Sequence, residues 1–427
     1  MTDESRSKEQ GAKPEPAVAE VLESPSQKFL PYGRQNVTKN DIEAVTAVLR
    51  SDWLTQGPDI PAFEKSLCEA VGAGYAVACS SGTAALHLAM MALGIGPGDE
   101  VVTSPITFLS SANCALFVGA EVRFADIDSE TGLMNPAELE KVLKKDTGKK
   151  IKAVIPVHLA GQPSQLGEIH RLAAAHGASL VDDACHAIGA RYYYNEREYS
   201  VGGSPHAALT AFSFHPVKHV AMGEGGAVTT ASPEYREKLE RFRCHGMQKE
   251  DFVIGEMALS PEGETNPWYY EMQEPGYNYR LTDIQAALGD SQLKRLGPSL
   301  KKRNELAEYY RQLIEENFPE GSVRPLDVSP GVLHAYHLQV VLIEFEKCGV
   351  SRAEVMNRLR RDGIGSQVHY IPVPLQPYYR RRYGFKPGDF PRAEKYYARA
   401  LSLPMYPELE RSDCERVIKS LKKALNR

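Results

Sequence analysis

The feature that most constrains the fold is a regular alternation of short apolar segments with helix-forming segments between residues 75 and 185. Valine-containing, mostly apolar segments of this kind, separated by helices, predict parallel strands that are covered on both faces. We therefore expect an α/β fold with a large, doubly wound and mostly parallel sheet. The predicted strands lie at 75–79, 100–104, 121–127, 152–158 and 179–185.

Several small, polar or aromatic residues fall at or just after the end of a predicted strand. In a doubly wound sheet, ligands bind outside the carboxyl ends of the strands. The shared position of these residues therefore predicts a functional site along one edge of the sheet. They are Gly82, Phe108, His158, Asp183 and Lys218.

The most informative of these positions is Lys218, which lies in the segment TAFSFHPVKHVAMGEGGA at 210–227. A short apolar, β-prone run delivers Ser213 and Lys218 into a turn rich in glycine. Burial there would disfavour the ammonium form and lower its pKa, and a neutral amine is what a Schiff-base lysine requires. Because most lysines are solvated surface charges, the hypothesis that Lys218 carries pyridoxal phosphate (PLP) needs support from the rest of the chain.

A PLP site also requires a carboxylate for the pyridine nitrogen and an aromatic ring against the cofactor. Asp182 and Asp183 are the candidate carboxylates, and adjacent residues of a strand face opposite ways. We choose Asp183, which lies nearer the C-terminal end of the strand. Phe108 is the stacking candidate and His186 a candidate partner for the ring hydroxyl, although a core aromatic and an ordinary polar residue are the alternatives.

The phosphate of such a cofactor needs several hydrogen-bond donors. The segment Ser80-Ser81-Gly82-Thr83 stands between a predicted strand and a predicted helix. Glycine allows close backbone approach, and a helix N-terminus points free N–H groups at an anion. The alternative is ordinary N-capping by Ser81 or Thr83.

Composition excludes several other classes of protein. A net charge of -5 gives no reason to expect nucleic acid or an anionic membrane as a partner, and no apolar run is long enough to span a bilayer. The seven cysteines are scattered without a C-x-x-C pair, and the first ten residues lack the apolar core of a signal peptide. We expect a cytoplasmic protein.

The HPVKH motif at 215–219 contains a proline and lacks the glutamate of H-E-x-x-H, so we predict no metal.

The chain divides into three predicted parts. Residues 1–27 are polar and contain three prolines, which predicts a disordered tail. Residues 28–296 form the predicted PLP-binding large domain, and residues 297–427 a smaller C-terminal α+β domain with strands at 335–343 and 366–373. A long irregular stretch at 249–276 predicts a cover for a site or an interface.

Together these motifs resemble the sugar-nucleotide aminotransferases of PLP-dependent fold type I, and the resemblance covers roughly residues 29–425. Several segments look most like the branch that aminates UDP-linked 4-keto-6-deoxy-N-acetylhexosamines, in particular that of the pseudaminic-acid pathway. The motifs that carry it are SGTAALHLA, SPITFLSSANCAL, VHLAGQP, DDACHAIGA, SFHPVKHVAMGEGGA, RCHGM, GYNYRLTDIQAALG, VHYIPV and LSLPMYP.

The resemblance implies a role for each cofactor residue. Lys218 would form the Schiff base and shuttle the proton, and Asp183 would pair with the pyridine nitrogen. His186 would bond the ring hydroxyl, at a position where many relatives carry glutamine, and Phe108 would stack on the ring. The residues implied to hold the phosphate within one subunit are Gly82, Thr83 and Ser213.

The resemblance also implies a homodimer, because Asn278 would reach the same phosphate from the other subunit. The substrates would be a nucleotide sugar and an amino-acid donor, usually glutamate. The 4-keto-6-deoxy sugar would receive an amino group at C4. The segments implied to line the sugar pocket contain Tyr32, Trp53, Leu54, Thr55, His369 and Tyr370.

Three rival functions remain. In the PLP-dependent sugar dehydratases of this fold a histidine replaces the lysine, so Lys218 argues against them. A desulfurase or a decarboxylase of the same fold is the second rival; the desulfurase needs a mobile cysteine, and none stands out by position. A non-catalytic PLP-binding regulator would be favoured by a broken residue set or an appended DNA-binding segment. Ser213, Lys218 and Asp183 are all present, and the first 26 residues cannot form a helix-turn-helix, so we expect an enzyme.

Overall fold

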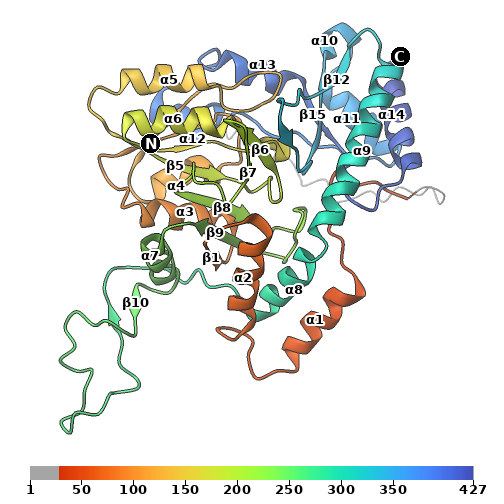
Figure 1. The fold of residues 1–427 in the computed structure, drawn as a ribbon. Helices are drawn as coiled ribbons and strands as arrows, with labels where there is room; N and C mark the ends of the chain where they lie inside the picture. The colour runs from red at the N-terminus through yellow and green to blue at the C-terminus, as the bar shows by residue number, and fades with distance from the viewer. Residues whose placement is uncertain (1–27, 427) are drawn as a thin grey trace, which may run out of the picture.

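The computed structural model describes residues 28–426, so the tail predicted for 1–27 lies outside the described residues. The described chain forms a large α/β body and a smaller C-terminal α+β body (Figure 1). The predicted fold class is therefore confirmed. Within the described residues no helix is both long and apolar enough to cross a membrane, and the cytoplasmic location stays a prediction.

A seven-stranded sheet forms the centre of the large body, in the order β1-β9-β8-β5-β4-β2-β3. β9 pairs antiparallel with both of its neighbours, and the other pairings are parallel. The predicted strands are thus present and mostly parallel. The strands are β1 (Tyr75–Cys79), β2 (Glu100–Thr103), β3 (Glu121–Phe124), β4 (Ile151–Ile155), β5 (Ser179–Asp183), β8 (Leu209–Ser213) and β9 (Gly226–Thr230).

Helices cover both faces of this sheet, because the side chains of each strand alternate between two apolar clusters. In β1, Val77 and Cys79 belong to one cluster and Ala76 and Ala78 to the other. The first cluster includes side chains of α3 (Gly82–Ala92), α4 (Ser110–Phe117), α7 (Pro233–Arg243) and α12 (Pro377–Tyr383). The second includes α2 (Asp59–Val71), α5 (Pro136–Lys145), α6 (Leu166–His176) and α8 (Asp283–Leu293).

The sequence signals for helix starts agree with the structure. Thr38 and Asp41 form a capping box at the start of α1 (Lys39–Leu49), and Thr282 forms one with Gln285 at the start of α8. The Ser81 side chain accepts a hydrogen bond from the backbone N–H of Ala84 at the start of α3. Each cap satisfies backbone donors that a helix start would otherwise leave unpaired.

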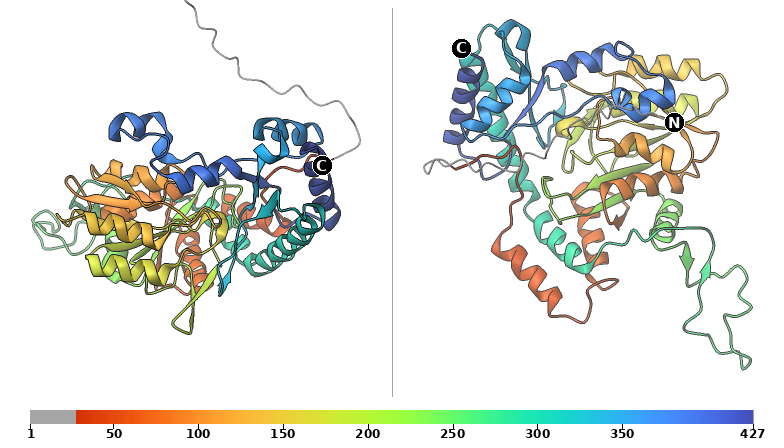
Figure 2. Two further views of the ribbon diagram at one scale, coloured as in Figure 1. Left: turned by 90° about the horizontal axis from the view of Figure 1, so that it is seen from above. Right: turned by 180° about the vertical axis from the view of Figure 1, so that it is seen from behind.

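The C-terminal body has its own apolar cluster, to which Leu30 from the start of the described chain also belongs. Helix α9 begins at Leu296 and lies beside α14 (Figure 2). The domain division at residue 297 stays a prediction. The elements are α9 (Leu296–Asn317), β12 (Val323–Pro325), β14 (Gln339–Ile343), α10 (Phe345–Cys348), α11 (Arg352–Arg361), α13 (Pro391–Arg399), β15 (Ala400–Leu403) and α14 (Arg411–Ala424), with an antiparallel sheet in the order β12-β14-β15.

The strand predicted at 366–373 is wrong. Only Gln367 pairs there, in a single bridge to Ser402, and a short 3-10 helix, η2 (Val373–Leu375), follows. Pro372 and Pro374 lack the N–H groups that strand pairing needs.

The short 3-10 helix η1 (Leu159–Gly161) and a small sheet were not predicted. That sheet consists of β6 (Arg191–Tyr194), β7 (Arg197–Ser200) and β13 (Val332–Leu333).

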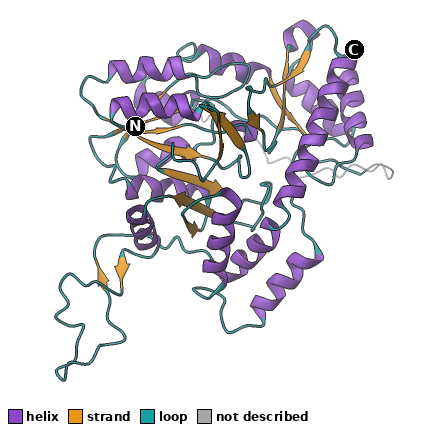
Figure 3. Cartoon of the chain, in the orientation of Figure 1, coloured by secondary structure: helices purple, strands orange, loops and turns teal. Residues whose placement is uncertain are grey.

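The irregular stretch after α7 forms an arm, residues 247–273, that projects from the large body (Figures 1 and 3). Its base is the pair β10 (Met247–Gln248) and β11 (Glu271–Met272). The Glu271 carboxylate accepts hydrogen bonds from the backbone N–H groups of Val253, Ile254 and Gly255, which fixes one side of the arm. Val253 and Trp268 are 77% and 73% exposed, so the arm presents apolar side chains to its surroundings.

Candidate active site

The residues predicted at the strand ends lie along one edge of the sheet. Asp183 is paired with Ala211 across β5 and β8, and Ser213 with Gly226 across β8 and β9. Gly82, three residues after the end of β1, lies against Ser213, because a Cβ atom added at residue 82 would be 2.8 Å from the Ser213 Cβ. β1, β5 and β8 run in the same direction, with the antiparallel β9 between β1 and β8, so the ends of these three strands lie at one edge of the sheet.

Lys218 follows β8 in a turn that its backbone N–H closes on the carbonyl of His215. Its side chain is half-buried, and burial lowers the pKa of the ammonium to about 8, against the opposing effect of Cys185 and Asp183. At pH 7 this leaves about one amine in ten neutral, far more than for an exposed lysine. The Lys218 Nζ lies 3.5 Å from Nε2 of His337.

Buried histidines surround this amine. The rings of His186 and His337 are 4.4 Å apart, and those of His219 and His337 are 5.7 Å apart. Burial holds the pKa of all three well below its usual range, so these rings are neutral at physiological pH. The Nδ1 atoms of all three are buried and lack a hydrogen-bond partner in the part of the chain that the structure describes.

The two adjacent aspartates separate as expected for a strand. Asp183 accepts a hydrogen bond from Ser111 Oγ at 2.5 Å and another from the backbone N–H of Cys185 at 3.2 Å. Asp182 points to the other face, where an oxygen lies 3.6 Å from Nε2 of His158. Asp183 is therefore the carboxylate on the face of α3 and α4.

The start of α3 forms a cradle of backbone donors. Ser81 accepts from Ala84 through its hydroxyl and from Ala85 through its carbonyl. This leaves the N–H groups of Gly82 and Thr83 without a partner among the described residues. Two free N–H groups at a helix N-terminus suit an anion such as a phosphate, and Ser213 lies beside them.

Further aromatic side chains lie next to these histidines. The Tyr370 hydroxyl lies 3.1 Å from His186 Nε2, and its ring centre is 6.1 Å from that of Phe108. The His369 ring contacts Tyr370 at 4.9 Å and Tyr32 at 5.4 Å. Phe108 is 57% exposed, so its ring faces open space beside these residues.

The structure does not bring four of the predicted site residues to this group. Thr55 bridges to Thr282 and the Leu54 carbonyl accepts from the N–H of Asp283, at the start of α8. Trp53 is 54% exposed, and Asn278 is exposed beside Cys244. Across residues 28–426 no hydrogen bond or ring contact joins Trp53, Leu54, Thr55 or Asn278 to Lys218.

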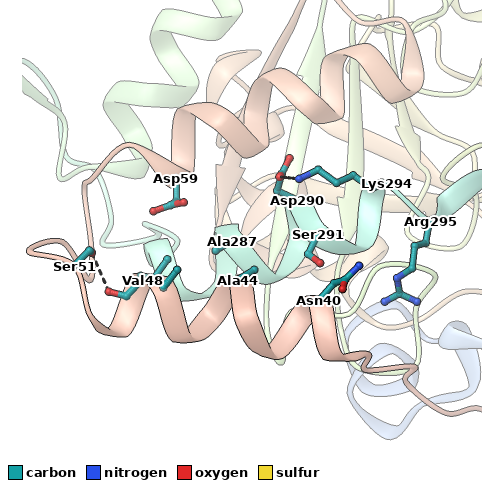
Figure 4. Close-up of a pocket in the computed structure, with 11 residues that line it drawn as sticks. Asn40, Ala44, Val48, Ser51, Asp59, Ala287, Asp290, Ser291, Lys294 and Arg295 are labelled. Atoms are coloured by element: carbon teal, nitrogen blue, oxygen red, sulfur yellow. Dashed lines mark hydrogen bonds and ion pairs between the residues drawn. The ribbon is translucent and has the colours of Figure 1, made fainter.

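Cavity size alone does not locate this site. A cavity of about 510 Å³ lies between α1, α2 and α8 and contains none of the predicted site residues (Figure 4). There Lys294 pairs with Asp290, and Arg295 lies at one end. A smaller cavity of about 220 Å³ is lined by Lys218.

These residues fit PLP as a bound group. Lys218 supplies an amine of lowered pKa, and Asp183 supplies a buried carboxylate for a protonated ring nitrogen. The buried Nδ1 of His186 has no partner among the described residues, which suits a polar ring substituent. Gly82 and Thr83 offer N–H groups for a phosphate.

Sequence reasoning missed Ser111, His219 and His337. Ser111 lies one helical turn after Phe108 within a motif already singled out, so its position was a usable signal. His337 precedes a strand of the C-terminal body, more than a hundred residues after Lys218. Only the tertiary fold brings these two together.

Comparison with known proteins identifies the family. The model of the DegT/DnrJ/EryC1/StrS aminotransferase family matches residues 35–422. The spore coat polysaccharide biosynthesis protein SpsC of Bacillus subtilis is 42% identical over 395 residues, which cover 92% of this chain and 96% of SpsC.

Solved structures agree in fold over nearly the whole chain. Helicobacter pylori PseC, an aminotransferase involved in the biosynthesis of pseudoaminic acid, superposes with a TM-score of 0.82 at 30% identity, covering 93% of this chain and all of PseC. Spr1654 from Streptococcus pneumoniae, solved in PLP and PMP forms, gives a TM-score of 0.80 at 27% identity, covering 93% of this chain and up to 99% of Spr1654. The chain therefore belongs to the DegT/DnrJ/EryC1/StrS aminotransferase family and is a PLP-dependent sugar aminotransferase.

Proposed function

We propose that this enzyme transfers an amino group from glutamate to C4 of a nucleotide-linked 4-keto-6-deoxy sugar, specifically a UDP-linked N-acetylhexosamine. The product would enter the biosynthesis of a surface or secondary-metabolite amino sugar. The observation that carries the proposal is the position of Lys218 near Asp183 and near His369, whose ring contacts Tyr32 and Tyr370.

Each residue of the site has a role in this reaction. When bound, PLP supplies a carbonyl that exchanges amino groups and a ring that accepts electrons from the substrate's Cα–H bond. Lys218 would hold PLP at rest; in the first half-reaction its Nζ would remove the Cα proton of glutamate, and in the second it would deliver a proton to the sugar carbon that carries the new amine. Asp183 keeps the ring nitrogen protonated, and His186 orients the ring hydroxyl.

The same site would bind the other groups of the cofactor. Gly82, Thr83 and Ser213 would hold the phosphate, and Phe108 would lie against the ring. In the sum of both half-reactions, glutamate and the ketosugar become 2-oxoglutarate and the amino sugar. No other reactant is needed.

The relatives support a surface-sugar substrate. SpsC is a protein of spore coat polysaccharide biosynthesis, and PseC an aminotransferase of pseudoaminic acid biosynthesis. The aromatic residues near Lys218 suit the apolar faces and hydroxyl groups of a sugar, because tyrosine and histidine combine an apolar body with a polar tip.

The proposal includes a homodimer. Asn278 and the loop of Trp53, Leu54 and Thr55 are exposed and lie away from Lys218 of their own subunit, which suits residues that complete the site of a second copy. The apolar side chains of the arm at 247–273 also suit an interface.

The test is turnover with glutamate and a panel of UDP- and dTDP-linked 4-keto-6-deoxy sugars, with and without an N-acetyl group. We expect the UDP-linked N-acetylated ketosugars to give the highest kcat/KM and Lys218→Ala to give none. If glutamate changes the cofactor's visible spectrum but no ketosugar of the panel is aminated, the substrate assignment is wrong. Mass spectrometry of the product fixes the position of the amine.

A further inference from the structure

The amine of Lys218 has a single hydrogen-bonding neighbour in the part of the chain that the structure describes. The Nε2 atom of His337 lies 3.5 Å from the Lys218 Nζ. Asp183 and Cys185 act on this amine only through their charge, without a hydrogen bond to it. An ammonium at Lys218 therefore has one side chain to which it can donate, the imidazole of His337.

The His337 ring is enclosed and neutral. It is 4% exposed, and its centre lies 4.4 Å from that of His186 and 5.7 Å from that of His219. Burial, aided by the positive charge of Lys218, holds the pKa of His337 well below its usual range. Its Nδ1 has no hydrogen-bond partner among residues 28–426, so no neighbour prevents the tautomer in which Nε2 is an acceptor.

The backbone around His337 is held by the large body. The N–H of Ala335 donates to the carbonyl of Gly161 at 2.9 Å. The N–H of Leu338 donates to the carbonyl of Ala160 at 3.2 Å, and Ala160 has a φ of 59°, which residues other than glycine rarely adopt. A Cβ atom at Gly161 would be 3.0 Å from the backbone nitrogen of His337, so the two segments are in direct contact. Such backbone strain is typical of functional sites.

Two side chains hold the same segment from other elements. The His219 Nε2 donates to the carbonyl of Ala335 at 2.8 Å. The Nη1 of Arg303, on α9, donates to the carbonyls of Tyr336 at 3.0 Å and His337 at 3.5 Å. Contacts from η1, from the turn after β8 and from α9 thus fix where the imidazole lies relative to the amine.

We propose that His337 is a positioning residue that accepts a hydrogen bond from the Lys218 amine whenever this amine is free of the cofactor. The proposal rests on the proposed role of Lys218 and deepens it. In the first half-reaction the Cα–H bond of the donor breaks, an N–H bond forms at Nζ, and the electron pair stays with the substrate and cofactor. The ammonium so formed lies beside an acceptor, which stabilises it and holds it in place until it gives up the proton.

The other titratable and charged groups around this pair have no hydrogen bond to the amine within residues 28–426. Replacing His337 therefore removes the direct acceptor and leaves their charges in place. They are Asp183, Cys185 and His186 at and after the end of β5, His219 in the turn after β8, His369, and Arg34, Arg295 and Arg303, which line the cavity of about 220 Å³ together with Lys218.

Loading of PLP into the cofactor-free protein tests the contact without turnover. The loading rate, read from the growth of visible absorbance, follows the neutral amine of Lys218 and so reports its pKa. Because an acceptor favours the ammonium form, we expect His337→Leu to lower this pKa by about one unit. His337→Gln should keep the wild-type value, because its amide oxygen also accepts. If His337→Leu does not fold, His337→Met fills the space without a strong acceptor and carries the same expectation.

His334→Leu is the matched control for the loss of a buried imidazole. His334 is also 4% exposed and stacks on Tyr336, with no hydrogen bond to Lys218 in the described chain. Its pH profile of loading should equal that of the wild type. Equal profiles in the wild type and His337→Leu would overturn the proposal. A shift of the same size in His334→Leu would also overturn it, because lost packing alone would then explain the effect.

Glutamate deuterated at Cα gives a second readout in the PLP-loaded protein. The first half-reaction is followed in the cofactor spectrum with labelled and unlabelled glutamate. We expect it to be about tenfold slower in His337→Leu, with a larger isotope effect, and to stay within about threefold of the wild type in His337→Gln. A slower reaction without a larger isotope effect would place His337 in donor binding and contradict the proposed contact.

Lys218→Ala separates this proposal from the proposed function. If Lys218→Ala still loads PLP covalently, another residue holds the cofactor, and the roles proposed for Lys218 and His337 are both wrong. If Lys218→Ala does not load and His337→Leu keeps the wild-type pH profile, only the role of His337 is wrong. Neither result depends on which amino donor or ketosugar the enzyme uses.

Discussion

Among single residues, Lys218 has the property that is easiest to measure. Burial lowers its pKa to about 8, whereas the pKa of a free lysine amine is about 10.4. The rate of covalent PLP loading into the cofactor-free protein follows the neutral amine. We expect this rate to rise about tenfold per pH unit below pH 8 and then to level off.

The measurement is the growth of visible absorbance after mixing with PLP between pH 6 and 10. The reaction of PLP with an acetylated lysine amide is the control for the titration of PLP itself. If loading of the protein keeps rising to pH 10, as in the control, Lys218 is an ordinary exposed amine.

The neighbouring aspartates provide a matched pair of variants. Asp183 lies on the face of Gly82 and Ser213 and bonds Ser111, whereas Asp182 points to the opposite face. Asp183→Asn removes the charge that keeps the ring nitrogen protonated, so we expect turnover to fall about 100-fold or more. Asp182→Asn should keep turnover within about threefold and change mainly the Tm. Equal losses of turnover in both variants would contradict the assignment.

The residues at strand ends could be predicted from the sequence because their position depends on local pattern alone. Lys218, Asp183 and Gly82 each follow an apolar strand, and parallel strands bring their ends together. His337 could not be found in this way. Its contact with Lys218 depends on how the C-terminal body packs on the sheet, and no local spacing encodes that.

Among the helices and strands, the start of α3 is where a substitution should have the clearest steric effect. A Cβ at residue 82 would lie 2.8 Å from the Ser213 Cβ and 3.2 Å from the Cys185 Sγ. Gly82→Ala therefore displaces the helix start from β8, and we expect the Kd for PLP to rise about tenfold.

Gly297→Ala is the control for this variant, since a Cβ there meets nothing within 4 Å and the residue lies in α9. It should leave PLP affinity unchanged and raise the Tm slightly, because alanine favours a helix over glycine. Fluorescence titration with PLP measures both variants. An unaltered Kd in Gly82→Ala would remove this helix start from the phosphate site.

Two segments depart from their local sequence preference, for different physical reasons. Helix α13 ends at Arg399 although helix-favouring residues continue to Leu401, because Ala400–Leu403 pairs with β14 and Leu401 is buried there. Helix propensity in ARAL is a weak preference that tertiary burial overrides. The alternation in VHYIPV suggests a strand, but Pro372 within it and Pro374 just after it lack the N–H groups that a strand pairing needs.

For the whole molecule, the arrangement of exposed site residues leads to a prediction about assembly. Asn278 and Lys218 of one subunit do not meet, although the resemblance assigns both to one site. If each site takes Asn278 from the other subunit, the homodimer is the catalytic unit. Such a dimer would be of the symmetric kind that is commonest among oligomers.

Mixing two inactive variants tests this arrangement. Lys218→Ala removes the amine and Asn278→Ala a phosphate ligand, so each homodimer should have little activity at limiting PLP. A mixed dimer has one site with an intact Lys218 facing an intact Asn278. After unfolding and refolding together in equal amounts, about one quarter of the sites should be active if subunits pair at random. If Asn278 serves its own subunit, every site in the mixture lacks one of the two residues, and no activity returns.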